Sequence, residues 1–305
     1  MALEKMEPYV PMVARPYGSD NIFGNIDIFF DPRFWLDVAP SFTISEALNF
    51  SAFKLSDAEK ECNKSRILVE GYTHLQNPGL EAPFPEMAAL FVKLVDMGLP
   101  PAFAFVFDEF WKLSSQLDDF IGGVLHEDYA MLPDFWAWLI KPGASGFAPH
   151  RDKGPDSLFP DRRPKSLTVW LPITEAHPLN GCMYILPANR DRLYGVGQQF
   201  GGTLADIRAL PGKPGDVFSW TQHAFHWSAH AADEHTLPPR MSVAFEFQRR
   251  DIPAYNMPLL KPGVTPPFER RLALIAKQVI QYKHLYGPTL DLLNAARTIL
   301  AKSPL

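Results

Sequence analysis

The sequence changes character near residue 129, and this change sets the strongest limit on the possible folds. From there, short runs of aromatic and β-branched residues follow one another, separated by Pro, Gly and Asn turns, and each such run predicts a strand. The predicted strands are 135–141, 166–173, 182–186, 216–220 and 241–247. No helical stretch of about 10 to 15 residues alternates with them, as a parallel βαβ sheet would require. We therefore expect an antiparallel sandwich or barrel.

The segments on both sides of these strands are predicted to be mostly helical. Ser56 and Glu59 have the spacing of a capping box, which begins a helix that ends near residue 69, with Gly71 as its C-cap. A first strand is expected at 72–75. Apolar periodicity predicts further helices over 86–97, 102–121, 268–286 and 289–301. The first 40 residues have no sustained period, but their aromatic side chains are costly to expose, so we expect an irregular arm that packs onto the body.

Composition and charge argue against several classes of protein. The chain of 305 residues is 47% hydrophobic and 21% charged, which is ordinary for a globular protein. Its net charge of −5 gives no reason to expect nucleic acid or an anionic membrane as a partner. Cys62 and Cys182 are too few for a disulfide framework, and no apolar run resembles a signal peptide or a membrane span. We therefore expect a cytoplasmic protein, with homodimer formation left open.

A histidine and an aspartate two positions apart, His150 and Asp152, mark the candidate site. In a strand, residues i and i+2 point to the same side, so an imidazole and a carboxylate at this spacing can bind one ion. A non-haem iron centre needs a second histidine and leaves positions open for a cosubstrate and O2. His223, His226 and His230 are the candidates for that second histidine.

Arg240 and Ser242 form a second pair with the same spacing, at the start of the last predicted strand. A guanidinium and a hydroxyl on one face make a receptor for a carboxylate, because arginine donates two parallel charged hydrogen bonds to it. A dicarboxylate cosubstrate needs such a receptor at the end away from the metal. Glu246 lies an even number of positions from Arg240 and Ser242 in the same predicted strand, so its side chain is expected to point inward as theirs do. An unpaired carboxylate is costly there.

In their order along the chain, these features resemble the phytanoyl-CoA dioxygenase-like family of Fe(II)- and 2-oxoglutarate-dependent oxygenases. The resemblance covers about residues 130 to 250, with a weaker similarity at 55–75. Its motifs are Lys141-Pro142 ahead of His150-x-Asp152, Ser166-Leu167-Thr168-Val169-Trp170, Asn180-Gly181-Cys182-Met183-Tyr184-Ile185-Leu186-Pro187, Gly215-Asp216-Val217 ahead of His226, and Arg240-x-Ser242. The sequence departs from the family at Pro187-Ala188-Asn189-Arg190, where Pro-Gly-Ser-His is usual.

The resemblance implies a mainly β fold with helices: a double-stranded β-helix (a cupin-like jelly roll) with buttressing N- and C-terminal helices. It implies a single catalytic domain over 1–305. Within that domain we expect an irregular arm over 1–54, a helical buttress over 55–128, the β-helix core over 129–250 and a helical extension over 251–305.

The resemblance also implies which residues bind the metal. His150, Asp152 and His226 would hold Fe(II), with His226 selected over its neighbours by its distance from the Gly-Asp turn. The implied reaction consumes O2 and converts 2-oxoglutarate to succinate and CO2, while a C–H bond of a small organic substrate is oxidised, most simply by hydroxylation. Related halogenases put chloride in the place of this carboxylate, so Asp152 argues against halogenation.

At the cosubstrate, the resemblance implies roles for four further residues. Arg240, with Ser242 beside it, would bind the distal carboxylate of 2-oxoglutarate. Trp170 falls where the family often has an aromatic residue against the cosubstrate, and Lys141 is expected as a neighbour.

Three other functions compete with a dioxygenase that acts on a specialised metabolite. They are an acyl-CoA hydroxylase, a non-catalytic jelly-roll protein that binds a metal or small ligand, and a cupin-like hydrolase or isomerase that uses a metal without oxygen. The fold class alone cannot choose the substrate. The basic pairs at 162–163, 249–250 and 270–271 are interpreted as solvated surface rather than as a site for the phosphates of coenzyme A.

Overall fold

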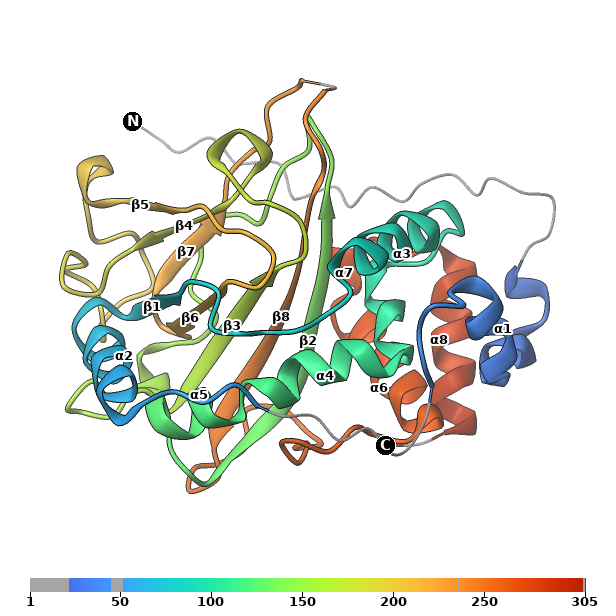
Figure 1. The fold of residues 1–305 in the computed structure, drawn as a ribbon, viewed down its shortest axis with the longest axis horizontal. Helices are drawn as coiled ribbons and strands as arrows, with labels where there is room; N and C mark the ends of the chain where they lie inside the picture. Colours follow the sequence, from blue (N-terminus) through green and yellow to red (C-terminus); the bar gives the residue numbers. More distant parts are fainter. Residues whose placement is uncertain (1–21, 45–51, 235, 304) are drawn as a thin grey trace.

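The computed structural model describes residues 22–44, 52–234, 236–303 and 305, so residues 1–21 and 45–51 of the predicted arm lie outside the described residues. Two antiparallel sheets form one side of the molecule, and most of the helices lie on the other side of the larger sheet (Figure 1). Within the described residues, no helix is both long and apolar enough to cross a membrane.

The larger sheet has five strands, and the smaller sheet has three. The order in the larger sheet is β1 (Tyr72–Leu75), β6 (Val217–Thr221), β3 (Ser166–Pro172), β8 (Arg240–Arg249) and β2 (Tyr129–Ile140). The order in the smaller sheet is β5 (Arg208–Leu210), β4 (Met183–Leu186) and β7 (Phe225–Ser228). All pairs are antiparallel. This arrangement confirms the mainly β, jelly-roll core with flanking helices.

Strand β8 shows how the sequence separates the helical core from the site. Every residue of β8 is buried, but alternate side chains face opposite sides of the sheet. Met241, Val243, Phe245 and Phe247 belong to the main hydrophobic core on the helical side. Ala244, between them, belongs to a second apolar cluster on the other side of the sheet. A shift of one residue in the register would exchange these two sets, so the alternation fixes the register.

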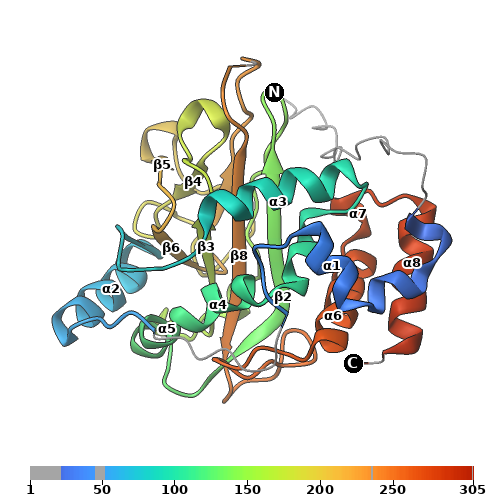
Figure 2. The ribbon, with the colours of Figure 1, turned by 45° about the vertical axis from the view of Figure 1, so that its right-hand side comes forward.

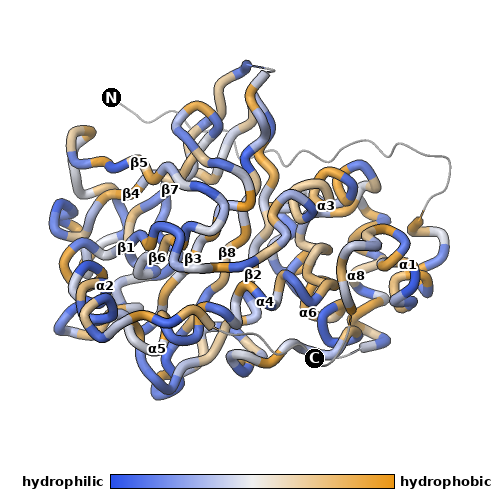
Figure 3. Tube along the Cα trace, in the orientation of Figure 1, coloured by the Kyte–Doolittle hydropathy of each residue, from blue (hydrophilic) through white to orange (hydrophobic). Residues whose placement is uncertain are grey.

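Most of the α-helices cover the outer face of the larger sheet and its β2 edge, and the short helices η4, η5 and η6 lie in connections between strands (Figure 2). Their bounds are η1 (Ile22–Gly24), η2 (Ile26–Phe30), α1 (Pro32–Val38), α2 (Asp57–Glu70), α3 (Phe84–Asp96), η3 (Pro101–Val106), α4 (Asp108–Gln116), α5 (Asp118–Val124), η4 (Pro155–Ser157), η5 (Pro178–Asn180), η6 (Leu204–Asp206), α6 (Phe268–Gln281), α7 (Lys283–Tyr286) and α8 (Leu290–Lys302). Colouring by hydropathy shows hydrophobic and hydrophilic residues alternating along helices such as α6, as expected for helices that bury one face (Figure 3).

Several sequence predictions are confirmed, and some need correction. The capping box of Ser56 and Glu59 and the left-handed Gly71 cap enclose α2 as predicted. The helix predicted over 102–121 is wrong as one element, because Phe107 takes an extended backbone conformation and separates η3 from α4. The strands β5 and β7 were not predicted, and the part of the arm within 22–38 is helical rather than irregular. Trp35 in this arm is fully buried, which confirms that the arm packs.

The basic pairs predicted to be solvated include two buried arginines. Arg271 on α6 is fully buried, forms an ion pair with Asp108 at 2.5 Å and donates a hydrogen bond to the Val106 carbonyl at 2.8 Å. Arg249 is also buried and pairs with Asp251 at 2.5 Å. The prediction was wrong for Arg271 because a charged side chain tolerates burial when a partner of opposite charge is buried with it. Arg249 differs, since its partner Asp251 is exposed at the surface.

We expect Arg271→Leu to lower the free energy of unfolding by about 3–5 kcal/mol, because it leaves the Asp108 carboxylate buried without its ionic partner. Urea unfolding followed by tryptophan fluorescence measures the change. The neighbouring Arg270→Leu is the matched control, and it should change stability by less than about 0.5 kcal/mol. Equal destabilisation by the two substitutions would contradict a structural role for the ion pair.

Candidate metal centre

Three potential metal ligands meet between the two sheets. The backbone segment at His150 pairs with His226 on β7, with N–O distances of 3.0 and 2.9 Å, and so extends the smaller sheet. The Nε2 atoms of His150 and His226 lie 3.2 and 3.5 Å from Oδ1 of Asp152. The donor atoms all lie within 4.8 Å of one another. One ion could therefore contact all three side chains.

The groups around these side chains orient them toward a common point. Nδ1 of His150 lies 2.8 Å from the Ala148 carbonyl, and Nδ1 of His226 lies 3.0 Å from the Ala224 carbonyl. Because a carbonyl only accepts, each Nδ1 carries the proton, and each Nε2 keeps a lone pair for a metal. Two imidazole nitrogens and a carboxylate oxygen are the donor set of non-haem iron sites.

The carboxylate of Asp152 is also held in place. Its Oδ2 accepts hydrogen bonds from the Thr168 hydroxyl at 2.7 Å and from Nε1 of Trp220 at 3.3 Å. These bonds leave Oδ1 directed at the two histidines. Such supporting hydrogen bonds fix the geometry of a metal ligand.

The ionisation states suit a cation. Burial lowers the pKa of His226 to about 4, so its imidazole is neutral near pH 7. Burial alone would raise the pKa of Asp152, but His226, His150 and the Thr168 hydroxyl outweigh it and hold that pKa below its usual range. The site therefore offers a neutral imidazole at His226 and a charged carboxylate at Asp152, the forms in which these groups bind metals.

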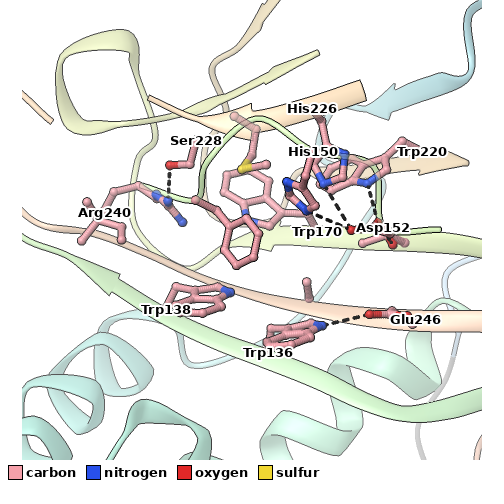
Figure 4. Close-up of a pocket in the computed structure, with 15 residues that line it drawn as sticks. Trp136, Trp138, His150, Asp152, Trp170, Trp220, His226, Ser228, Arg240 and Glu246 are labelled. Carbon is pink, nitrogen blue, oxygen red and sulfur yellow. Dashed lines mark hydrogen bonds and ion pairs between the residues drawn. The ribbon is translucent and has the colours of Figure 1, made fainter. Parts of the chain in front are cut away.

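Arg240 lies at the other end of the same pocket (Figure 4). It is buried, and it donates hydrogen bonds to Oγ of Ser242 at 2.6 Å, to Oγ of Ser228 at 2.7 Å and to the Gly181 carbonyl at 3.2 Å. Its guanidinium also lies 5.7 Å from the centre of the Trp170 ring. Ser228 was not singled out from the sequence, although its i+2 spacing from His226 on β7 is a signal that could have found it.

The pocket between these two ends has an empty volume of about 640 Å³, counting its open mouth. Its walls carry the three metal-ligand candidates, Arg240, Trp170 and several apolar side chains. Nε1 of Trp170 is buried and has no hydrogen-bond partner among the described residues. A guanidinium at one end, a metal-ligand set at the other and an indole N–H without a protein partner fit a dicarboxylate that spans the pocket.

Three residues considered from the sequence lie elsewhere. Lys141 is not among the residues that line the pocket. His223 is buried outside it, with Nδ1 3.0 Å from the Lys153 carbonyl, and His230 lies beside the Ser145 hydroxyl at 2.9 Å. The structure thus brings His226, rather than its two neighbours, to His150 and Asp152.

Comparisons with known proteins agree with this geometry. The phytanoyl-CoA dioxygenase family (PhyH) matches residues 86–234, a stretch that contains all three metal-ligand candidates. A search of curated proteins finds no match.

Solved structures show similar folds. One is the nickel complex of the non-heme monooxygenase ThoJ, whose sequence is 14% identical to this chain. The TM-score is 0.52, and the match covers 73% of this chain and 98% of that chain. In the match to the apo form of ThoJ, the sequence identity is 12% and the TM-score is 0.51, over 79% of this chain and 99% of that chain. The epimerase SnoN in complex with Fe3+, alpha ketoglutarate and nogalamycin RO is 14% identical, with a TM-score of 0.49 over 69% and 96%. At these identities, the likeness to ThoJ concerns the fold.

The family match and the ordered set of motifs lead to one identification. Over residues 86–234 the chain is similar to the phytanoyl-CoA dioxygenase family, and the protein is a non-haem Fe(II)- and 2-oxoglutarate-dependent oxygenase.

Proposed function

We propose that the protein hydroxylates a C–H bond of a small organic molecule, a specialised metabolite, and forms succinate and CO2 from 2-oxoglutarate. One observation carries this proposal: a two-histidine, one-carboxylate cluster and a buried arginine lie at opposite ends of one pocket. A jelly-roll protein that only binds a metal has no need for the arginine end.

In this proposal, His150, Asp152 and His226 bind Fe(II) through Nε2, Oδ1 and Nε2. Arg240 binds the distal carboxylate of 2-oxoglutarate, with the Ser228 and Ser242 hydroxyls holding its guanidinium. Trp170 lies against the cosubstrate and donates its free N–H to it. Arg240 and Trp170 thereby orient the cosubstrate so that its 2-oxo acid end faces the metal.

The bound iron and cosubstrate supply the oxidising chemistry with O2, and the protein supplies binding, orientation and exclusion of water. Apolar and aromatic walls keep the pocket dry and limit the positions that a substrate can take. Phe147 lies beside His150, with ring centres 4.4 Å apart, and Trp138 packs against Phe147 at 5.9 Å. These rings would hold the substrate carbon next to the metal.

We expect His226→Ala to abolish the visible charge-transfer absorption that appears when Fe(II) and 2-oxoglutarate are added without oxygen, because the variant removes one of the three ligands. His230→Ala is the matched control and should keep the absorption, since His230 contacts Ser145 rather than the site. The assignment fails if the wild-type protein shows no such absorption, or if the two variants behave in the opposite way.

We expect Arg240→Leu to weaken 2-oxoglutarate binding by at least about 30-fold, because removal of one partner of a buried charged contact costs about 2–5 kcal/mol. Titration of the same absorption with 2-oxoglutarate measures the dissociation constant. Arg208, which pairs with Glu70 away from the pocket, provides the control Arg208→Leu. Unchanged 2-oxoglutarate affinity in Arg240→Leu would rule out the proposed clamp.

A further inference from the structure

Glu246 is an acidic residue in the pocket that the proposed chemistry does not use. It lies on β8, on the same side as Arg240, but near the metal-ligand end of the pocket (Figure 4). The sequence predicted that it points inward, and the structure confirms this: only 7% of the residue is exposed. A buried carboxylate on a pocket wall is costly unless something compensates its charge.

The protein compensates Glu246 only in part. Oε1 accepts one hydrogen bond, from Nε1 of Trp136 at 3.1 Å. Oε2 accepts from Nε2 of Gln222 at 2.5 Å and from Nζ of Lys153 at 3.4 Å. A carboxylate can accept about four hydrogen bonds, so the side of Oε1 can accept another.

The electrostatics agree with this bonding pattern. Burial raises the pKa of the Glu246 carboxyl to about 7, and the carboxylates of Asp134 and Asp152 act in the same direction. Lys153 opposes them without restoring the usual pKa. A cationic ligand beside Glu246 would therefore gain a strong partner and would stabilise the charged carboxylate.

Two tryptophans form an aromatic floor next to Glu246. Trp136 and Trp138 are two positions apart on β2, their ring planes differ by 9° and their centres are 5.8 Å apart. Figure 4 shows the two indoles side by side along one wall of the pocket, with Glu246 at the Trp136 end. Tyr286 packs on both rings and holds them in place. The face of an indole attracts a cation, and more strongly in a site shielded from water.

This floor ends close to the candidate metal site. Gln222 donates to Glu246 and also lies 3.4 Å from the Thr168 hydroxyl, which in turn donates to Asp152. Among the described residues that line the pocket, Arg240 is the only lysine or arginine, and it lies at the opposite end. The described lining residues therefore offer a substrate a carboxylate and two aromatic faces at the end of the pocket near the metal-ligand candidates, and Lys153 contacts Oε2 of Glu246 from outside this lining.

We infer that Glu246 and the floor of Trp136 and Trp138 determine substrate specificity by binding a positively charged amine. The substrate class is then a small amine with an apolar body, rather than a carboxylic acid. This inference rests on the proposed function, because Arg240 must be occupied by the cosubstrate. The ammonium would lie over the indole faces and donate a hydrogen bond to Oε1 of Glu246, which would hold the apolar body beneath the metal.

Matched probes of one size test the inference. Cyclohexylamine, cyclohexanol and cyclohexanecarboxylate are titrated into protein loaded with Fe(II) and 2-oxoglutarate without oxygen, and binding is measured by calorimetry. We expect the wild-type protein to bind the amine at least about tenfold more tightly than the alcohol, and the carboxylate most weakly. In Glu246→Gln, which keeps the shape of the side chain, the advantage of the amine should fall below about threefold. Glu269→Gln, an exposed acid on α6, should retain it.

Two outcomes overturn the inference: equal binding of amine and alcohol by the wild-type protein, or an amine advantage that survives in Glu246→Gln. If Glu246→Gln does not fold, Trp138→Leu replaces it, and an undiminished amine advantage in that variant overturns the inference as well. The charge-transfer absorption separates the two proposals. Its absence in the wild-type protein means that the proposed function fails, whereas its presence without an amine preference refutes only the role of Glu246.

Discussion

Two backbone hydrogen bonds between His150 and His226 are the contact on which the candidate site depends. They join a segment that follows β2 to the edge of the smaller sheet, so residues far apart in the sequence become neighbours. The pleat then directs both imidazoles to one side, with ring centres 4.4 Å apart. Asp152 follows within the same segment, and Thr168 and Trp220 from the larger sheet hold it. The metal-ligand set is therefore a consequence of how the two sheets face each other.

The end of the pocket that holds Arg240 depends on close backbone packing around Gly181 and Gly146. The Gly181 carbonyl accepts hydrogen bonds from both Ser228 and Arg240. Gly181 has a φ of +80°, and a Cβ there would lie 2.8 Å from the Ala229 carbonyl oxygen. A Cβ at Gly146 would lie 2.1 Å from Oγ of Ser228. Gly146 thus leaves room for the serine that holds the guanidinium, and Gly181 leaves room for the backbone of the residue after that serine.

The sequence predicted the parts of the structure that depend on local pattern. The strands rich in aromatic residues, the α2 caps and the inward direction of Glu246 follow from spacing and parity alone. The choice of His226 over His230 came from the family resemblance. The two residues are an even number of positions apart, so strand alternation alone places both on the same side, and only the backbone pairing of His226 with His150 distinguishes them. The short strands β5 and β7 and the buried pair of Arg271 with Asp108 could not be predicted, since each exists through contacts between distant segments.

The central claim is that one iron ion and one 2-oxoglutarate lie between the histidines and Arg240. Crystals grown without oxygen in the presence of Fe(II) and 2-oxoglutarate, measured at the iron absorption edge, test it most directly. We expect a single anomalous peak in contact with Nε2 of His150, Oδ1 of Asp152 and Nε2 of His226, with the distal carboxylate of 2-oxoglutarate on Arg240. An iron peak at His223 or His230, or 2-oxoglutarate bound away from Arg240, would contradict the account.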